Sequence, residues 1–296
     1  MDEKISVIIP TRNAESQIGN LLSTIKSQSI PCEIIIIDSS STDKTVAVSE
    51  SYGARVIPIK KEDFNHGGTR NVAAFKSNGD IIVFMTQDTL PVDKNCIENL
   101  TKPLGQDNIA ASYGRQIAYD NAKPTEKFAR NFNYPETAAI KSAESIEHSG
   151  IKTFFFSNAF SAIRKPEFKV LGGFPEDVLM FEDMLFAAKL VFKGFSIAYV
   201  PDAKVIHSHD LSFSGQFERY FQAGVSFRKN SWFLEHAKSG SEGVRFLKEE
   251  IKYLLQHNAH HWAFYAVIEA LFKYSGYKIG LNYDKIPFFI KKYLNE

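Results

Sequence analysis

Short, fully apolar runs in the first hundred residues constrain the fold more than any other feature. Lys4–Pro10, Glu33–Asp38 and Asp80–Met85 are rich in isoleucine and valine, and strands of that composition are typically buried on both faces. Segments with apolar residues at helical spacing lie between the runs, such as Ala14–Gln28,. This alternation predicts an α/β fold with a mostly parallel, Rossmann-like central sheet and helices on both faces.

The order of elements becomes mixed beyond Pro91, and the chain is almost entirely helical and aromatic from about Ser212. We therefore expect a catalytic domain over residues 1–211 and a helical C-terminal extension over residues 212–296. From residue 273 to the end the extension has five lysines against two acidic residues. A basic, aromatic helical segment suits the surface of an anionic membrane, but packing on the core or in a homodimer explains the composition equally well.

Charge and cysteine content exclude several classes of protein. Thirty-five Lys and Arg against 34 Asp and Glu give a net charge of +1, which disfavours a general nucleic-acid coat protein. Two cysteines support neither a disulfide framework nor a thiolate zinc site. The acidic start and the lack of a long apolar run predict a cytoplasmic protein, unless it rests on the inner face of the cell membrane.

A further short strand is predicted at Arg55–Ile59. Polar residues follow each of these four strands, where ligands of a parallel sheet bind. The four segments are Thr11-Arg12-Asn13, Asp38-Ser39-Ser40, Asp63–Asn71 and Thr86-Gln87-Asp88. Asp88 has the oxygen ligands that Mg²⁺ or Mn²⁺ prefers, although capping of a helix over Val92–Leu100 is an alternative. Asp38 is suited to accept the imide N–H of a uracil or thymine ring, with a plain turn as the other interpretation.

The segment around Gly67 and Gly68 is suited to phosphate. Adjacent glycines allow close approach of a ligand and leave N–H groups free at a helix start. Arg70, one turn later, is placed to bind a diphosphate with two hydrogen bonds. His66 before the pair is a donor to phosphate or sugar, or an ordinary loop residue.

Two further clusters lie later in the chain. Glu182 and Asp183 open a predicted helix within Pro175–Lys193, where an acid flanked by apolar residues serves as a general base or as a helix cap. His207 and His209 end a strand on the same face. One imidazole is suited to Mg²⁺, Mn²⁺ or phosphate, and a purely structural pair is the alternative.

These segments, in this order, resemble the family 2 glycosyltransferases of GT-A fold. The likeness rests on Ser6–Asn13, Ile37–Thr45, Gln87-Asp88 and Glu182-Asp183, and it runs over nearly the whole chain. Residues 64–71, followed by Thr86-Gln87-Asp88, are similar to the bacterial rhamnosyltransferase subgroup, as are residues 207–209, 216–221 and 273–280.

The resemblance implies an inverting, metal-dependent transferase that moves L-rhamnose from dTDP-L-rhamnose to a saccharide acceptor, often a lipid-linked one, in cell-surface polysaccharide synthesis. It implies Mg²⁺ or Mn²⁺ at Asp88, with His207 as an added ligand because Thr86 replaces the first acid of the family's Asp-X-Asp motif. Asp183 corresponds to the catalytic base and Glu182 is the lesser candidate.

The same resemblance implies a donor site at the strand ends. Thr11 and Asp38 hold the base and ribose, and Arg70 lies near the base or the phosphates. The remaining residues assigned to the donor site are Pro10, Asn13, Ser40, His66, Gly67, Asn71 and Gln87. Two alternatives stay open: a GT-A transferase with a UDP-hexose donor, and a non-catalytic module that binds nucleotide sugars or glycans.

Overall fold

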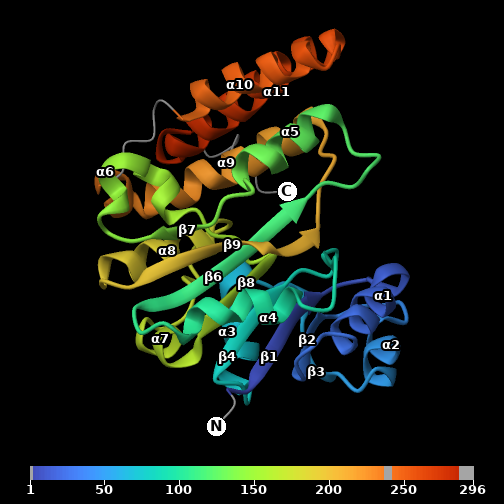
Figure 1. Ribbon diagram of the computed structural model, residues 1–296. Coiled ribbons are helices and arrows are strands. Elements are labelled where there is room, and N and C mark those ends of the chain that lie inside the picture. Colours follow the sequence, from blue (N-terminus) through green and yellow to red (C-terminus); the bar gives the residue numbers. More distant parts are fainter. Residues whose placement is uncertain (1–2, 237–241, 287–296) are drawn as a thin grey trace.

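The computed structural model describes residues 3–236 and 242–286 and consists of a twisted sheet with helices on both faces and a helical layer at one end (Figure 1). The strands are β1 (Ile5–Thr11), β2 (Cys32–Ser39), β3 (Arg55–Ile59), β4 (Ile81–Met85), β5 (Leu90–Pro91), β6 (Ile109–Ile117), β7 (Ala139–Lys141), β8 (Phe160–Arg164) and β9 (Ser196–Ile206). The helices are α1 (Glu15–Lys26), α2 (Thr45–Ser51), α3 (His66–Lys76), α4 (Cys96–Thr101), α5 (Pro124–Asn133), α6 (Ser145–Ser149), α7 (Lys165–Val170), α8 (Glu182–Phe192), α9 (Phe213–Lys229), α10 (Glu242–Gln256) and α11 (His260–Leu281).

The strand order is β3-β2-β1-β4-β8-β6-β9-β5. The strand β5 pairs with the end of β9, at Val205 and Ile206, and β7 pairs with its beginning, at Ile197–Tyr199. The strands β3, β2, β1 and β4 are parallel to one another, as the sequence predicts. Antiparallel pairing enters where β8 joins β4, and β5 and β7 are also antiparallel to β9. The sheet is thus mixed, with a parallel half that aligns the carboxyl ends of β2, β1 and β4 at one edge.

The apolar strand residues divide between two cores. On β1, Val7 and Ile9 face the helices α1 and α4, whereas Ile8 faces α3 and α8. All three side chains are fully buried. Because successive strand residues point to opposite faces, an uninterrupted apolar run is the composition that a sheet covered on both sides requires.

One predicted helix start is confirmed and another is wrong. The helix α8 begins at Glu182, as predicted, directly after Phe181 with φ 68°, a conformation that interrupts a right-handed helix. The helix α4 begins at Cys96 rather than Val92. Asp88 therefore lies too far from α4 to cap it.

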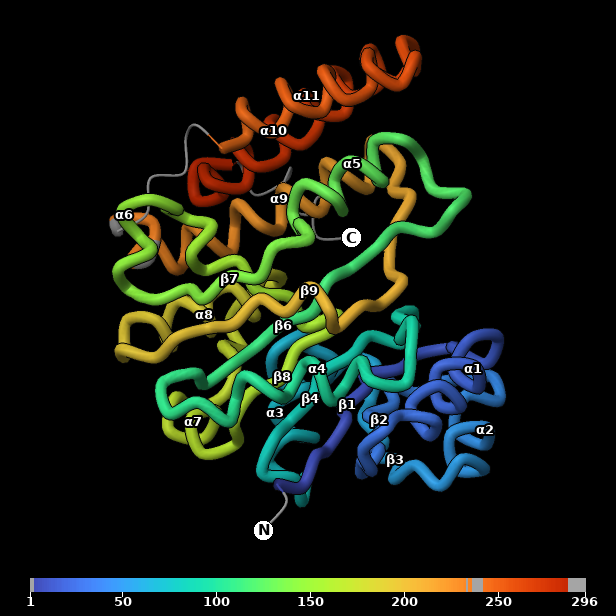
Figure 2. The backbone as a smooth tube through the Cα atoms, viewed as in Figure 1, coloured from blue at the N-terminus to red at the C-terminus, as the bar shows by residue number. Residues whose placement is uncertain are grey.

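The C-terminal helices form a layer beyond β9, with α9 next to the core and α10 and α11 outside it (Figure 2). Backbone meets backbone between α9 and α11, because a Cβ on Gly280 would overlap the carbonyl oxygen of Phe221. The layer is joined to the core where the Met180 N–H donates to Ser226 Oγ at 3.2 Å. In the described part of the chain, every helix is too short or too polar to cross a bilayer.

Candidate active site

The ends of β1 and β2 carry a hydrogen-bonded carboxylate. Thr11 and Asp38 are paired in register, both are buried, and Thr11 Oγ1 donates to Asp38 Oδ1 at 3.0 Å. The Ser41 N–H donates to Asp38 Oδ2 at 2.9 Å. Ser40 has φ 56° and its hydroxyl donates to the carbonyl of Ile59 at 3.0 Å. Pro10 precedes Thr11 within β1, so four residues assigned to the donor site lie together at this edge.

A second set of contacts ties the loop after β1 to its neighbours. Asn13 has φ 47°, and its Oδ1 accepts the Thr42 N–H at 2.9 Å. Gln87, beyond β4, accepts the Arg12 N–H at 2.8 Å. Asp43 accepts the N–H of Glu15 at 3.0 Å and the N–H of Thr45 at 3.0 Å, so its carboxylate joins the first residues of α1 and α2.

The glycine pair does not leave free N–H groups at the start of α3, contrary to the prediction. Asn65 is the N-cap residue, and its Oδ1 accepts from Gly67 N at 3.0 Å and Gly68 N at 2.8 Å. A Cβ on Gly67 would overlap the carbonyl oxygen of Pro175. Gly67 is therefore needed for close packing of α3 on the 174–176 segment. Its contact with a donor stays a prediction, to which free N–H groups no longer contribute.

Asn71 holds the same segment from the next turn of α3. Its buried amide donates to the carbonyl of Phe174 at 2.9 Å and to Glu176 Oε1 at 2.9 Å, and accepts from the Phe174 N–H at 2.8 Å. Both amide hydrogens are thus used inside the protein. This side chain stabilises the loop that leads to α8, and its place in the donor site also stays a prediction.

Arg70 and Glu182 form a buried ion pair. Arg70 Nη1 lies 3.2 Å from Glu182 Oε1, and each side chain is 6% exposed. The same nitrogen donates to the carbonyl of His66 at 2.7 Å, and Asn158 Nδ2 donates to Glu182 Oε1 at 3.2 Å. The guanidinium that was predicted to face a diphosphate is thus directed at Glu182, whose charge it compensates.

Asp183 lies beside this pair and has a perturbed pKa. Its Oδ2 accepts the Asn158 N–H at 3.1 Å, and its Oδ1 accepts the Met184 N–H at 2.8 Å. Burial, and then the negative charge of Glu182, raise the pKa of Asp183 to about 7. A carboxylate with that pKa is a competent proton acceptor near neutral pH. We refer to Glu182 and Asp183 as the acid pair.

Asp88, His207 and His209 form a second cluster, here named the Asp/His cluster. Asp88 Oδ1 lies 3.5 Å from His207 Nε2, and Asp88 Oδ2 lies 3.5 Å from His209 Nε2. One potential ligand atom from each residue lies within 4.8 Å of the others. Both histidines follow the end of β9 at Ile206, so they share a site although strand alternation is not what brings them together.

The electrostatics of the Asp/His cluster fit a divalent cation. Burial lowers the pKa of His207 to about 4, so the imidazole is neutral at physiological pH. Burial opposes ionisation of Asp88, but contact with His207 outweighs it and the pKa of Asp88 falls well below its usual range. His207 Nε2 is buried and has no hydrogen-bond partner among the described residues. A carboxylate with neutral imidazoles matches the ligand preference of Mn²⁺ and, less closely, Mg²⁺.

Hydrogen bonds join the Asp/His cluster to the acid pair. His207 Nδ1 lies 2.8 Å from Gln116 Oε1, and Gln116 Nε2 donates to Ser157 Oγ at 2.8 Å. The next residue, Asn158, bonds to both members of the acid pair. This chain of contacts links Asp88 to Asp183 through the interior of the protein.

Sequence reasoning missed several members of this site. Gln116 and Asn158 lie inside β6 and before β8, and no local pattern sets them apart. Arg219 on α9 lies in a segment that contributes to the family resemblance, but its role was not assigned. Burial is the main cause of the lowered pKa of His66 and of His209, and the charge of Arg219 lowers both further. This exposed guanidinium thus acts on both sides of the site.

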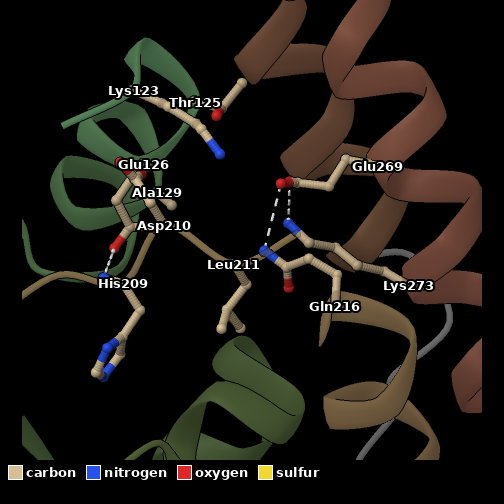
Figure 3. A pocket seen from close by; sticks show the side chains of 10 residues that line it. All are labelled: Lys123, Thr125, Glu126, Ala129, His209, Asp210, Leu211, Gln216, Glu269 and Lys273. Atoms are coloured by element: carbon tan, nitrogen blue, oxygen red, sulfur yellow. Dashed lines mark hydrogen bonds and ion pairs between the residues drawn. The ribbon is translucent and has the colours of Figure 1, made fainter. Parts of the chain in front are cut away.

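A small polar pocket adjoins His209 and is lined by α5, α11 and the connection from β9 to α9 (Figure 3). Glu126 on α5 accepts the His209 N–H at 3.3 Å. On the opposite wall, Glu269 accepts from Gln216 Nε2 at 3.3 Å and pairs with Lys273 at 2.5 Å. The C-terminal helices therefore contribute a polar wall next to the Asp/His cluster.

Comparisons with known sequences point to a single family. A family model described as glycosyl transferase family 2 matches residues 6–172. The chain is 42% identical to the O-antigen chain rhamnosyltransferase RfbN of Salmonella typhimurium, with 99% of this chain and 94% of that protein covered. It is 40% identical to the O-antigen chain rhamnosyltransferase WbaN of Salmonella anatum, with 98% and 93% covered.

Solved structures share the fold at low sequence identity. A mannosyltransferase from Pyrobaculum calidifontis, in complex with GDP-Man and Mn²⁺, has a TM-score of 0.66 at 17% identity and covers 95% of this chain and 88% of its own. Glucosyl-3-phosphoglycerate synthase from Mycobacterium tuberculosis, in complex with Mn²⁺, UDP and phosphoglyceric acid, has a TM-score of 0.56 at 18% identity, with 81% of each chain covered. These structures support the GT-A architecture.

Proposed function

Since the chain belongs to glycosyl transferase family 2, we propose that it is an inverting rhamnosyltransferase of polysaccharide synthesis. It transfers L-rhamnose from dTDP-L-rhamnose to a saccharide acceptor. The observation that carries this proposal is the near full-length similarity to two Salmonella proteins named as O-antigen chain rhamnosyltransferases. The connected Asp/His cluster and acid pair supply the chemistry that such a transfer needs.

The donor lies along the aligned ends of β2, β1 and β4 in this proposal. Asp38 and Thr11 contact the base and ribose, with Pro10, Asn13 and Ser40 beside them. The buried Thr11–Asp38 hydrogen bond fixes the carboxylate at the edge before any ligand arrives, which limits the conformational entropy lost on binding. Gln87 connects this edge to the Asp/His cluster through its bond to Arg12.

The Asp/His cluster holds Mg²⁺ or Mn²⁺ through Asp88 and His207, with His209 as an additional ligand. When bound, such an ion supplies positive charge that stabilises the negative charge on a departing diphosphate. His207 Nε2, which makes no hydrogen bond within the described residues, and a carboxylate oxygen of Asp88 are the ligand atoms. Arg219 adds a further cation near His66 and His209.

Asp183 acts as the base in a single displacement. The acceptor hydroxyl oxygen attacks the anomeric carbon, its proton passes to the Asp183 carboxylate, and the bond from that carbon to the diphosphate oxygen breaks. Attack opposite to the leaving group inverts the configuration. Asn158 orients the carboxylate through its N–H. The negative charge of Glu182 adds to the effect of burial and raises the pKa of Asp183.

A donor screen tests the proposal. We expect dTDP-L-rhamnose with Mn²⁺ to raise the melting temperature and to be consumed when the acceptor is present. UDP-hexoses are the matched comparison, and preference for one of them would replace the rhamnosyl assignment with the alternative donor. Binding without turnover by the wild-type protein would favour the non-catalytic module. An Asp183→Asn variant separates the two steps, because it should bind donor normally and lose about 10²–10⁴ in rate.

The acceptor is proposed to be carried by a lipid, and α11 offers a face for its membrane. Phe264, Leu271 and Tyr274 lie on one stripe of α11 and are 71%, 60% and 61% exposed. Glu269, the only acid in α11, is buried and pairs with Lys273, so α11 itself presents no exposed acid to an anionic surface. Such a stripe partitions into the interfacial region of a bilayer.

Sedimentation with anionic vesicles at low and high salt tests this contact. We expect binding at low salt, weaker binding at high salt, and loss of binding in a Phe264→Ser, Leu271→Ser double variant. A concentration-dependent dimer without vesicle binding would instead assign the stripe to a homodimer interface. The last basic stretch, at positions 287–296, lies outside the described residues.

A further inference from the structure

Gln116 lies at the centre of a hydrogen-bond network behind His207. Its side chain is buried, at 1% exposure. Its Oε1 accepts a hydrogen bond from Arg130 Nη1 and lies 2.8 Å from His207 Nδ1, and its Nε2 donates to Ser157 Oγ at 2.8 Å. Both ends of the amide are therefore engaged.

The chemistry of Arg130 determines which way this amide points. A guanidinium has donors only, so the Gln116 atom that faces it must be the acceptor oxygen. The same oxygen faces His207 Nδ1, so the imidazole must carry its proton on Nδ1. The lone pair of a neutral imidazole is then on Nε2. This buried atom lies 3.5 Å from Asp88 Oδ1 and has no hydrogen-bond partner in the described part of the chain.

We propose that Arg130 is a positioning residue that fixes the tautomer of His207 through Gln116, and so prepares His207 Nε2 to bind a divalent cation. The inference rests on the proposed function only for the identity of the ion. A hydrogen bond to the second ring nitrogen of a metal-binding histidine orients the ring and raises its affinity. Here Arg130, which reaches the ion only through Gln116 and His207, determines the hydrogen bond at His207 Nδ1.

Glu126 neutralises the positive charge of Arg130, which would otherwise repel a metal cation at His207. Arg130 Nε donates to Glu126 Oε1 at 2.7 Å, four residues earlier on α5. The two side chains are 15% and 14% exposed, so their charges largely cancel in a weakly solvated place. Glu126 Oε1 also accepts the N–H of His209 at 3.3 Å, and Figure 3 shows this bond. One ion pair on α5 thus supports both histidines of the cluster.

Nuclear magnetic resonance of ¹⁵N-histidine in the metal-free protein tests the proposal directly. In the wild type near neutral pH, we expect a pyrrole-like Nδ1 and a pyridine-like Nε2 for His207, assigned by comparison with a His207→Gln variant. Arg130→Met should release the amide and populate the other tautomer. Lys127→Met is the matched control, because it removes a cation from the same helix without a contact to Gln116, and it should leave the spectrum of His207 unchanged.

A rescue separates this role from a general loss of structure. Glutamate is acceptor-only when ionised, so adding Gln116→Glu to Arg130→Met should restore the Nδ1–H tautomer without the arginine. Mn²⁺ affinity should fall about 10–100-fold in Arg130→Met and recover in the double variant. An unchanged tautomer in Arg130→Met, or failure of the double variant to restore it, would overturn the proposal. Absence of Mn²⁺ binding by the wild type would count against the proposed function alone, since the tautomer is measured without metal.

Discussion

The pH dependence of turnover gives the sharpest test of the role of Asp183. Its pKa is raised from an ordinary 3.8 to about 7, and a general base acts only when deprotonated. With one group of that pKa, about one-tenth of the enzyme is active at pH 6 and about one-hundredth at pH 5. A carboxyl with an ordinary pKa would remain more than about nine-tenths ionised at pH 5.

The measurement is kcat/KM for transfer between about pH 5 and pH 8.5, with saturating cation and with cation binding followed separately. We expect a rise of about tenfold per pH unit below pH 7 and a plateau above it. Asp183→Asn should lose both the rate and the rising limb. Glu182→Gln should move the midpoint to lower pH, because the charge of Glu182 contributes to the raised pKa of Asp183. A flat profile from pH 5 to pH 8 in the wild type would refute the reasoning.

Stability offers a readout of the same pKa that does not depend on activity. The folded protein holds the Asp183 proton more tightly than the unfolded chain does, so the contribution of this carboxyl to the free energy of unfolding falls as pH rises from about 3.8 to about 7,. The melting temperature of Asp183→Asn relative to wild type should therefore be higher at pH 8 than at pH 4.5. The opposite trend would show that burial does not disfavour the charged form.

Three further predictions concern stability and reactivity. Glu182→Gln leaves the guanidinium of Arg70 buried without its counter-charge and should lower the free energy of unfolding in urea by about 3–5 kcal/mol. Gly280→Ala forces α11 away from the Phe221 carbonyl and should cost about 1–3 kcal/mol, measured in the same way; no change would mean that the two helices are not in backbone contact. Burial raises the pKa of Cys32 to about 11, so iodoacetamide at pH 8 should label this thiol far more slowly in the folded protein than in urea.

Local sequence pattern predicts the parallel half of the sheet well. The strands β1, β2 and β4 lie within one or two residues of the predicted runs, because burial on both faces leaves an apolar signature that needs no knowledge of distant contacts. Asp88 could be placed at a strand end for the same reason. The choice between cap and ligand could not be made locally, since it depends on histidines more than a hundred residues later.

The parts that escaped prediction depend on distant contacts. The left-handed backbone of Phe181, which directly precedes α8, has no signature in the local sequence pattern. Gln116 bonds to His207, which lies 91 positions later in the chain. The residues next to Gln116 in the sequence do not indicate this contact. The glycine pair favours an anion at the start of α3 when taken alone, but the side chain of Asn65 accepts both N–H groups.

The left-handed backbone at Phe181 has a consequence for how the chain can be divided. This residue directly precedes the acid pair, and its ring packs on Phe227 with centroids 5.4 Å apart. A fragment that stops near residue 211 keeps every strand of the sheet but lacks the aromatic ring against which this strained turn rests. Asp183, the proposed proton acceptor, thus follows a turn that packs against the last quarter of the polypeptide, and we expect a fragment that ends near residue 211 to hold this carboxylate less firmly than the whole chain does.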